Sequence, residues 1–371
     1  MNKEHRIDIL DSFRFIAILS VILFHYYSRW TPPGYTQNFY PYTNAGAAYF
    51  QYGLLGVNFF FIISGFVILY TLEKSVSYSG FLLKRLIRLF PSILLCSVIT
   101  YVCVMLMDKD HNYPIFHPSS LGFLPSLTFT NAKIWNDIMP NRNIAYIDGS
   151  YWSLPIEVTF YILSGLIYFI NKTKFISNWI LFSSVITIIL ALHDNFFPDN
   201  NFLTLFLTHF LLSDYILFFT MGMLSYALFF KKPLAKWNIP VFAILILFEY
   251  HHFTLNKTQH PVTFNWSIII ILLVYGILFA LFTFKPRYLG FLKIKAIQRI
   301  GVISYTIYLI HQFVGVLLIN KLAQVITSSY LLPYIPILVI LLVFLFAELC
   351  FRFYEKPISS YLKKALSKYI Q

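Results

Sequence analysis

Residues 264–284 read FNWSIIIILLVYGILFALFTF, a run without a charged side chain. A helix needs about 20 mostly apolar residues to cross the hydrocarbon core of a bilayer, so this run predicts a transmembrane helix. The same criterion, applied along the 371 residues, marks about ten segments. They are 11–30, 52–73, 89–107, 151–170, 177–193, 202–230, 238–253, 264–284, 301–320 and 332–354. The sequence therefore predicts an all-α integral membrane protein, a polytopic bundle of about ten transmembrane helices.

The composition argues against a soluble protein. Hydrophobic residues make up 58% of the chain and charged residues 12%, whereas a soluble domain has roughly 25% charged residues. The 40 Phe and 27 Tyr suit helices that meet lipid tails and headgroups. The net charge is +13, but the basic residues lie between the apolar segments and do not form one basic face of a soluble domain. No nucleic-acid partner is therefore expected.

The placement of Lys and Arg predicts the orientation. Most of the 28 basic residues fall on the side of the membrane where the chain begins, and by the positive-inside rule both termini are expected in the cytoplasm. The first apolar segment has no small-residue cleavage site after it, so it is expected to be retained. One transmembrane domain is expected over 1–371, with outward loops around 31–51 and 108–150. The basic tail, KPISSYLKKALSKYIQ, is expected on the cytoplasmic lipid surface.

Polar side chains inside apolar segments are candidates for function because they are costly in hydrocarbon. Arg14 and His25 are eleven residues apart, which places them on one side of a helix and about 16 Å apart along its axis. A neutral imidazole, with an ordinary pKa of about 6.5, can accept a hydroxyl proton. The alternative for His25 is a hydrogen bond to a neighbouring helix.

Two further groups allow a functional and a structural interpretation. In KRLIRLFP, Arg85 and Arg88 share a helix face and form a fork suited to phosphate oxygens, or they anchor the helix to lipid phosphates. In DGSYWSLPIEVTFY, Glu157 lies about a turn and a half inside the segment from Trp152. Its carboxylate needs a partner such as His25 or an Arg, and a structural salt bridge is the alternative.

A polar stripe marks GVISYTIYLIHQ, residues 301–312. Ser304, Tyr308 and His311 recur at helical spacing, so they are expected to face the interior or a water-filled cavity and not lipid. GVNFFFIISGF, residues 56–66, is typical of helix packing through small residues. Glu355-Lys356-Pro357 at the last boundary allows a capping or a functional role. Three other acidic residues lie in or near membrane segments and are given no role: Asp214, Glu249 and Glu348.

Taken in order, six stretches resemble the acyltransferase-3 family, membrane proteins that transfer acyl groups, usually acetyl, to sugars and other hydroxylated acceptors. The stretches cover nearly the whole chain. They are Asp11 with Arg14 and His25, then GVNFFFIISGF, RLIRLFP, YWSLPIE, SYTIYLIH and EKP. The resemblance implies a multi-pass protein of a cell membrane, with the bacterial cytoplasmic membrane expected. It also implies acetyl-coenzyme A as cosubstrate and a carbohydrate acceptor that can be lipid-linked, such as O-antigen or exopolysaccharide.

The resemblance also assigns residues. His25 is the implied catalytic histidine, Arg14 its partner and Glu157 a further member, while Arg85 and Arg88 are the implied contacts of the coenzyme A phosphates. The substrate-pocket candidates are Asp11, Trp152, Ser153, Ser304, Tyr305 and His311. Asn58 stands where many members have an acidic or other polar residue, and it is given no role.

The sequence fits other functional classes less well than an acyltransferase. No metal is expected, because neither H-E-x-x-H nor paired C-x-x-C spacing occurs. No extracytoplasmic esterase-like domain, which some family members carry, is expected. A transporter with an intramembrane His, Glu and Arg relay is the main alternative, although no inverted repeat is evident. A subunit of a polysaccharide export complex would not need these residues at membrane depth. The oligomeric state stays open.

Overall fold

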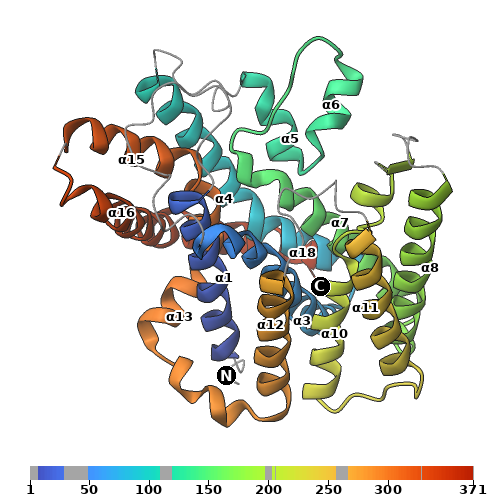
Figure 1. Ribbon diagram of the computed structural model, residues 1–371. Helices are drawn as coiled ribbons and strands as arrows, with labels where there is room; N and C mark the ends of the chain where they lie inside the picture. Colours follow the sequence, from blue (N-terminus) through green and yellow to red (C-terminus); the bar gives the residue numbers. More distant parts are fainter. Residues whose placement is uncertain are drawn as a thin grey trace. The chain divides into compact units, whose positions relative to one another are not determined.

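The computed structural model describes residues 7–28, 49–108, 119–196, 203–204, 206–255, 266–326 and 328–370. Helices dominate these residues, and none of them lies in a β-strand (Figure 1). They divide into two compact units. The first contains Met1–Val57, Lys84–Pro155 and Leu292–Lys368, and the second contains Asn58–Leu83, Ile156–Phe291 and Tyr369–Gln371. The predicted outward loop around 31–51 lies mostly outside the described residues.

Seven helices in the described part of the chain are long and apolar enough to cross a membrane. They are Asp8–Tyr27, Gln51–Glu73, Tyr78–Met107, Gly149–Ile170, Phe175–His193, Trp266–Phe284 and Leu332–Ala365. An eighth span results if Ser304–Ile310 and Phe313–Val325, which are bent by 60° at a short break, cross together. The protein is therefore an all-α, multi-pass membrane protein with seven or eight candidate spans in these ranges, compared with the ten or so predicted.

The difference in number has local causes. The predicted segment 202–230 is interrupted. A short π-helix over Phe206–Phe210 is followed by Leu212, whose φ of 61° does not continue a helix. The α-helix α10 (Ile216–Phe229) begins only after this residue. Asn238–Phe248 is likewise an apolar helix shorter than a full span. By contrast, α4 (Tyr78–Met107) begins well before the predicted residue 89, since Lys and Arg end a hydrophobic run without disfavouring a helix.

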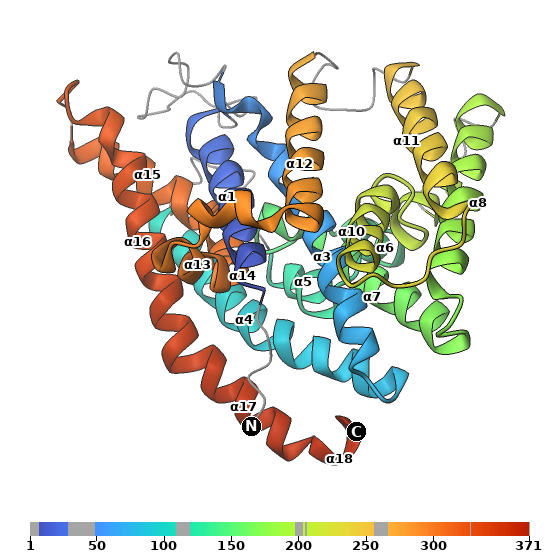
Figure 2. The same cartoon turned by 90° about the horizontal axis from the view of Figure 1, so that it is seen from below.

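In the first unit, α1 (Asp8–Tyr27) packs along α13 (Lys295–Val302), as Figures 1 and 2 show. Gly301 permits this contact, because a Cβ atom there would lie 1.8 Å from the Asp11 carbonyl oxygen. The Ser12 hydroxyl donates to the Leu292 carbonyl 2.7 Å away. α1 also contacts α14 (Ser304–Ile310) and α15 (Phe313–Val325), and α15 lies beside α16 (Ile335–Cys350).

A proline inside α4 explains a contact with the end of the chain. Pro91 has no N–H, so the carbonyl of Ile87, four residues earlier, loses its helical hydrogen bond. The Ser359 hydroxyl of α17 (Lys356–Ala365) donates to that carbonyl at 3.2 Å. A short π-helix over Phe351–Glu355 connects α16 to α17. The proline thus creates an acceptor that holds the amphipathic terminal helix against the start of α4.

In the second unit, α3 (Gly56–Glu73) crosses α10 at two glycines. A Cβ on Gly65 would lie 2.1 Å from the Phe219 carbonyl oxygen, and one on Gly222 would lie 1.9 Å from that of Ile62. Close packing through Gly65 is what the GVNFFFIISGF stretch predicted. α10 also contacts α8 (Phe175–Phe196) and α12 (Trp266–Phe284), and α11 (Asn238–Leu255) contacts α8.

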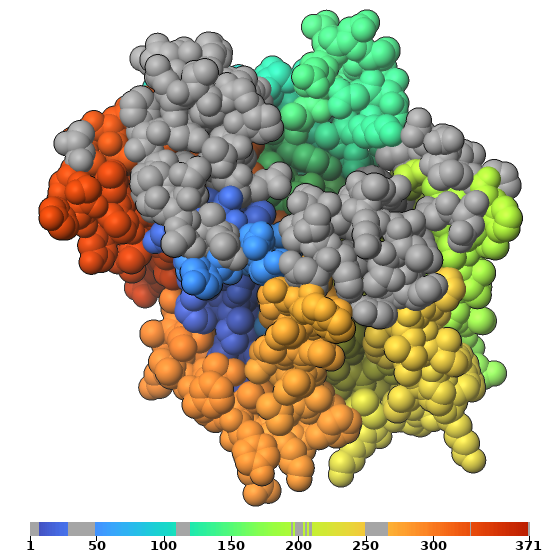
Figure 3. All heavy atoms as spheres, viewed as in Figure 1, coloured from blue at the N-terminus to red at the C-terminus, as the bar shows by residue number. Residues whose placement is uncertain are grey.

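The long helices carry exposed apolar stripes. On α8, four side chains at helical spacing are 45 to 59% exposed: Leu181, Val185, Ile188 and Leu192. Atoms of α8 are visible, in yellow-green, in the space-filling view of Figure 3. α12 exposes a similar stripe, which includes Ile270, Leu273 and Ile277. Such stripes are costly in water and are expected where lipid tails are the solvent.

Candidate functional site

Two histidines predicted from separate segments lie together in the first unit. His25, on α1, and His311, at the break between α14 and α15, have ring centroids 5.0 Å apart in an edge-to-face arrangement. His311 is fully buried and His25 is half-buried. The polar stripe of residues 301–312 therefore faces the interior, as predicted, and it meets the side of α1 that carries His25.

The tautomer of His311 follows from its contacts. Its Nδ1 lies 2.8 Å from the Tyr308 carbonyl oxygen, which can only accept, so Nδ1 carries the hydrogen in the neutral ring. Nε2 then holds a lone pair. That atom is buried and has no hydrogen-bond partner among the residues that the structure describes. Leaving a buried acceptor unsatisfied costs about 1–3 kcal/mol, so its position requires an explanation.

Side chains from other elements bind the carbonyls around the helix break. A break inside a membrane is tolerated only where the freed backbone groups find partners within the protein. The Tyr26 hydroxyl donates to the His311 carbonyl at 2.8 Å, and the Tyr151 hydroxyl donates to the Leu309 carbonyl at 3.1 Å. The Ser150 hydroxyl, whose hydrogen goes to the Asp148 carboxylate at 2.7 Å, also lies 3.2 Å from the Tyr308 carbonyl oxygen. The backbone that carries His311 is thus held from two sides.

Asp148 holds the start of α15. Its Oδ2 accepts from the Phe313 N–H at 2.9 Å, and its Oδ1 accepts from the Ser150 N–H and hydroxyl at 2.8 and 2.7 Å. The residue lies just outside the spanning segment that begins at Gly149. Burial raises the pKa of its carboxyl to about 6, although the three hydrogen bonds act in the opposite direction.

Other substrate-pocket candidates lie in or near this packing. Ser153 and Tyr308 share a hydrogen bond of 2.8 Å between their hydroxyls, and the Tyr308 hydroxyl donates to the Ser150 carbonyl at 2.8 Å. Ser304 is buried. Trp152, also a pocket candidate, is 39% exposed.

Arg14 and Asp11 form an ion pair of 2.9 Å one turn apart on α1. Asp11 is buried and lines a cavity of about 210 Å³ between α1 and α13, together with Asp8, Lys295, Gln298, Arg299 and Val302. The single continuous helix that carries Arg14 and His25 agrees with the predicted spacing. The role of Asp11 as a substrate-pocket residue stays a prediction.

Arg85 and Arg88 lie in the part of α4 before Pro91, where Arg85 is buried and Arg88 is half-buried. The Tyr305 hydroxyl donates to the Leu89 carbonyl at 3.3 Å in the same turn. Tyr305, predicted as a pocket residue, therefore contacts the segment predicted to bind phosphate.

Glu157 belongs to the second unit. Its carboxylate accepts from the Ser64 hydroxyl at 3.2 Å and from the Tyr161 hydroxyl one turn later on α7 (Ser153–Ile170). Within this unit, the Glu157 carboxylate is thus bound by one hydroxyl of the GVNFFFIISGF stretch and one of α7 itself. Sequence reasoning had named a histidine or arginine as the partner.

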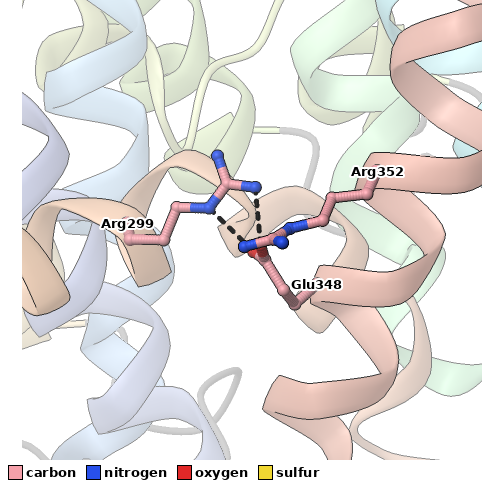
Figure 4. Close-up of polar contacts among 3 residues, drawn as sticks. All are labelled: Arg299, Glu348 and Arg352. Atoms are coloured by element: carbon pink, nitrogen blue, oxygen red, sulfur yellow. Dashed lines mark hydrogen bonds and ion pairs between the residues drawn. The ribbon is translucent and has the colours of Figure 1, made fainter.

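Two acidic residues outside the site have structural contacts. Glu348 of α16 accepts from Arg299 Nε and Nη2 at 2.7 and 2.8 Å and also from Arg352, as Figure 4 shows. These bonds tie α13 to α16. Glu355 accepts from the Thr306 hydroxyl at 2.7 Å, which agrees with an anchoring role for the terminal EKP motif.

The sequence analysis gave no role to four residues that build the site, although three of them lie in the stretch DGSYWSLPIEVTFY: Tyr26, Asp148, Ser150 and Tyr151. Asp148-Gly149-Ser150 does carry a local signal, because an Asp followed by small residues before an apolar run is typical of a helix start. The contact of Asp148 with α15, far along the chain, leaves no such signal. Tyr26 differs from the many other Tyr residues only in its proximity to His25.

The sequence is similar to those of known proteins over nearly its whole length. Residues 7–350 match the sequence model of a family described as an acyltransferase domain. The O-acetyl transferase of Shigella phage Sf6 is 28% identical over 162 residues, which are 44% of this chain and 46% of that protein. The O-acetyltransferase OatA of Staphylococcus aureus (strain NCTC 8325 / PS 47) is 25% identical over 382 aligned residues, which cover 94% of this chain and 56% of that protein. The chain thus spans about half the length of these relatives. No solved structure gives a significant match.

Proposed function

Starting from the fact that the chain belongs to the acyltransferase-3 family, we propose that it is a membrane O-acyltransferase. It moves an acyl group, acetyl in the first instance, from cytoplasmic acyl-coenzyme A to a hydroxyl of a carbohydrate. The acceptor is a cell-surface or lipid-linked glycan of the O-antigen or exopolysaccharide class. The names of the two relatives, both O-acetyl transferases, support the choice of acetyl and of an oxygen acceptor.

The observation that carries the proposal is His25 on a membrane helix beside the fixed break at His311. A neutral imidazole at that place can take the proton of an acceptor hydroxyl as its oxygen bonds to the thioester carbonyl carbon. The carbon–sulfur bond then breaks, and the coenzyme A thiolate leaves and takes up a proton. In the second possible route the acyl group rests on His25 before it reaches the hydroxyl.

The donor end of the site is proposed at Arg85 and Arg88. Guanidinium groups bind phosphate oxygens through paired hydrogen bonds, and coenzyme A presents several phosphates. The half-buried Arg88 can reach a ligand at the helix surface, while the buried Arg85 supports it from one turn earlier. Arg14, held by Asp11, lies on the same helix as His25 and about 16 Å nearer its start.

The test is acetyl transfer by His25 variants. Membrane vesicles from cells expressing the full chain would receive radiolabelled acetyl-coenzyme A, and label in carbohydrate would be scaled to detergent-stable protein. His25→Ala is expected to lose about 10²–10⁴-fold in rate, the usual contribution of a positioned base. His25→Gln is expected to fail almost as badly, because an amide keeps a hydrogen bond but cannot take a proton near neutral pH.

The matched control is His193→Gln. His193 is a buried histidine on another membrane helix, and its Nε2 lies 3.1 Å from the Thr204 hydroxyl, a contact that an amide can replace. It should transfer acetyl at the wild-type rate. Full transfer by His25→Gln would remove His25 from the catalytic role, and wild-type vesicles that label no carbohydrate would contradict the proposed function itself.

A further inference from the structure

We infer that His311 is a positioning residue for His25: its Nε2 lone pair accepts the N–H of the His25 imidazole when that ring takes up the acceptor's proton. This inference rests on the proposed function and assigns a task to an atom that the mechanism above does not use. Two observations support it: the ring centroids lie 5.0 Å apart, and the buried Nε2 has no hydrogen-bond partner among the residues described by the structure.

The protein determines which nitrogen His311 presents. Because Nδ1 is held by the Tyr308 carbonyl at 2.8 Å, Nε2 is the nitrogen left with a lone pair. The ring cannot easily exchange these roles, since the backbone on both sides of His311 is fixed. Tyr26 binds its carbonyl and Asp148 binds the N–H of Phe313, two residues later.

Such an acceptor suits a base that becomes charged. When His25 takes a hydroxyl proton, its ring becomes an imidazolium with N–H donors on both nitrogens. A third group that accepts one of these hydrogens orients the base and stabilises its charge, as in nucleophile and base pairs generally. Catalytic hydrogen bonds are often long without substrate and shorten in the reacting complex. The 5.0 Å between centroids lets side-chain rotation bring the two nitrogens into reach.

The close fit around the break supports a purpose beyond packing. A Cβ on Gly315 would lie 1.8 Å from the Tyr26 hydroxyl oxygen, so only glycine lets that tyrosine reach the His311 carbonyl. Tyr26 follows His25 directly on α1. One turn of α1 therefore supplies both the proposed base and the group that fixes the backbone of its neighbour.

Two substitutions separate this role from a structural one. In His311→Asn, the amide N–H takes the place of Nδ1–H and keeps the bond to the Tyr308 carbonyl, but nothing replaces Nε2. In His311→Gln, the longer side chain places an amide oxygen near the position of Nε2 and so keeps an acceptor. The rate of acetyl transfer from radiolabelled acetyl-coenzyme A would be measured in vesicles at several donor concentrations, scaled to detergent-stable protein.

The expected result is a kcat about 10- to 100-fold lower for His311→Asn, by analogy with the loss that follows removal of a group that orients a metal-bound histidine. His311→Gln should keep a rate within a few-fold of the wild type, and the KM for acetyl-coenzyme A should not change in either variant. A purely structural His311 predicts the opposite order, because Asn preserves the backbone contact and Gln disturbs it. Equal rates for the two variants, or a faster Asn variant, would overturn the inference while wild-type transfer upholds the proposed function. Wild-type protein without transfer would remove both.

Discussion

Asp148 is fully buried, accepts three hydrogen bonds and stands directly before a membrane-spanning segment. Two effects act on its carboxyl in opposite directions: hydrogen bonding favours the charged form and burial disfavours it. The N–H groups of Ser150 and Phe313 need an acceptor, and a carboxylate is a strong one. Burial, however, penalises the charged form, and this effect is the larger of the two. The result is a titratable group whose protonation is linked to the fold of the α14–α15 break.

We expect this linkage to appear in the pH dependence of stability. The folded protein holds the Asp148 proton up to a pKa of about 6, whereas the ordinary value is 3.8. Between these values the folded state binds more protons than the unfolded chain, so the free energy of unfolding falls as the pH rises through this window. A shift of about two pH units corresponds to roughly 3 kcal/mol.

The measurement is the thermal midpoint of purified protein in detergent between about pH 4 and pH 7. Asp148→Asn cannot titrate, so its midpoint should lack the part of the decline that Asp148 contributes. It should also be less stable than the wild type at the acidic end, since its amide N–H faces the Phe313 N–H. If wild type and variant show parallel pH profiles, Asp148 does not titrate in this range.

At the scale of single elements, apolar runs predicted the long helices well, because helix length and hydrophobicity are local properties. The break at His311 could not be predicted in the same way. The segment YLIHQFVG has no proline at the break, and a continuous helix over 301–320 was expected. The break is stable because Asp148, Tyr26 and Tyr151 satisfy the freed backbone groups, and these contacts depend on residues far away in sequence.

Pro91 leads to a prediction about α4 and α17. Ser359→Ala should weaken the attachment of α17 by about 1 kcal/mol, since it removes one hydrogen bond to a carbonyl that has no helical partner. In Pro91→Ala the new N–H can bind the Ile87 carbonyl, so adding Ser359→Ala should then cost much less. Hydrogen exchange of α17 in the four combinations measures this coupling. Equal effects of Ser359→Ala in both backgrounds would show that Pro91 does not create the site.

The start of α4 carries a second prediction, which concerns donor binding. Replacing Arg85 and Arg88 by Ala should weaken acetyl-coenzyme A binding about tenfold or more, because each bond between a guanidinium and a phosphate contributes about 1.5–3 kcal/mol. Lys363→Ala with Lys364→Ala removes the same charge from the exposed terminal helix and should change affinity little.

Arg88→Lys keeps the charge of the half-buried residue without the planar fork, and it should bind the donor less tightly than the wild type. This variant also separates binding from folding, because Arg85 stays buried and unchanged. Binding of acetyl-coenzyme A to purified protein measures all three. If the arginine pair and the lysine pair lose equal affinity for acetyl-coenzyme A, Arg85 and Arg88 would instead be anchors that bind lipid phosphates.

For the whole molecule, the number of crossings decides where the termini lie. The bent pair Ser304–Ile310 and Phe313–Val325 decides whether the number of candidate spans is seven or eight. Seven spans place the termini on opposite sides of the membrane, and eight place them on the same side. The two shorter apolar helices, Ile216–Phe229 and Asn238–Phe248, change the count by two if both cross. The basic residues predict an even number, because they favour both termini in the cytoplasm.

Single cysteines introduced into a chain with Cys96, Cys103 and Cys350 replaced test this topology. Three candidate spans precede the exposed Lys133, so it should lie opposite the N-terminus, and one more span separates it from the exposed Lys172. An impermeant thiol reagent applied to intact cells should label Lys133→Cys, while Lys172→Cys and Lys368→Cys should react only after the membrane is opened. Labelling of Lys133→Cys from the cytoplasmic side alone would invert the arrangement. Labelling of Lys368→Cys in intact cells would mean an odd number of crossings. If neither or both of the shorter helices cross, the bent pair would then be a re-entrant loop that brings His311 to His25 without crossing the bilayer.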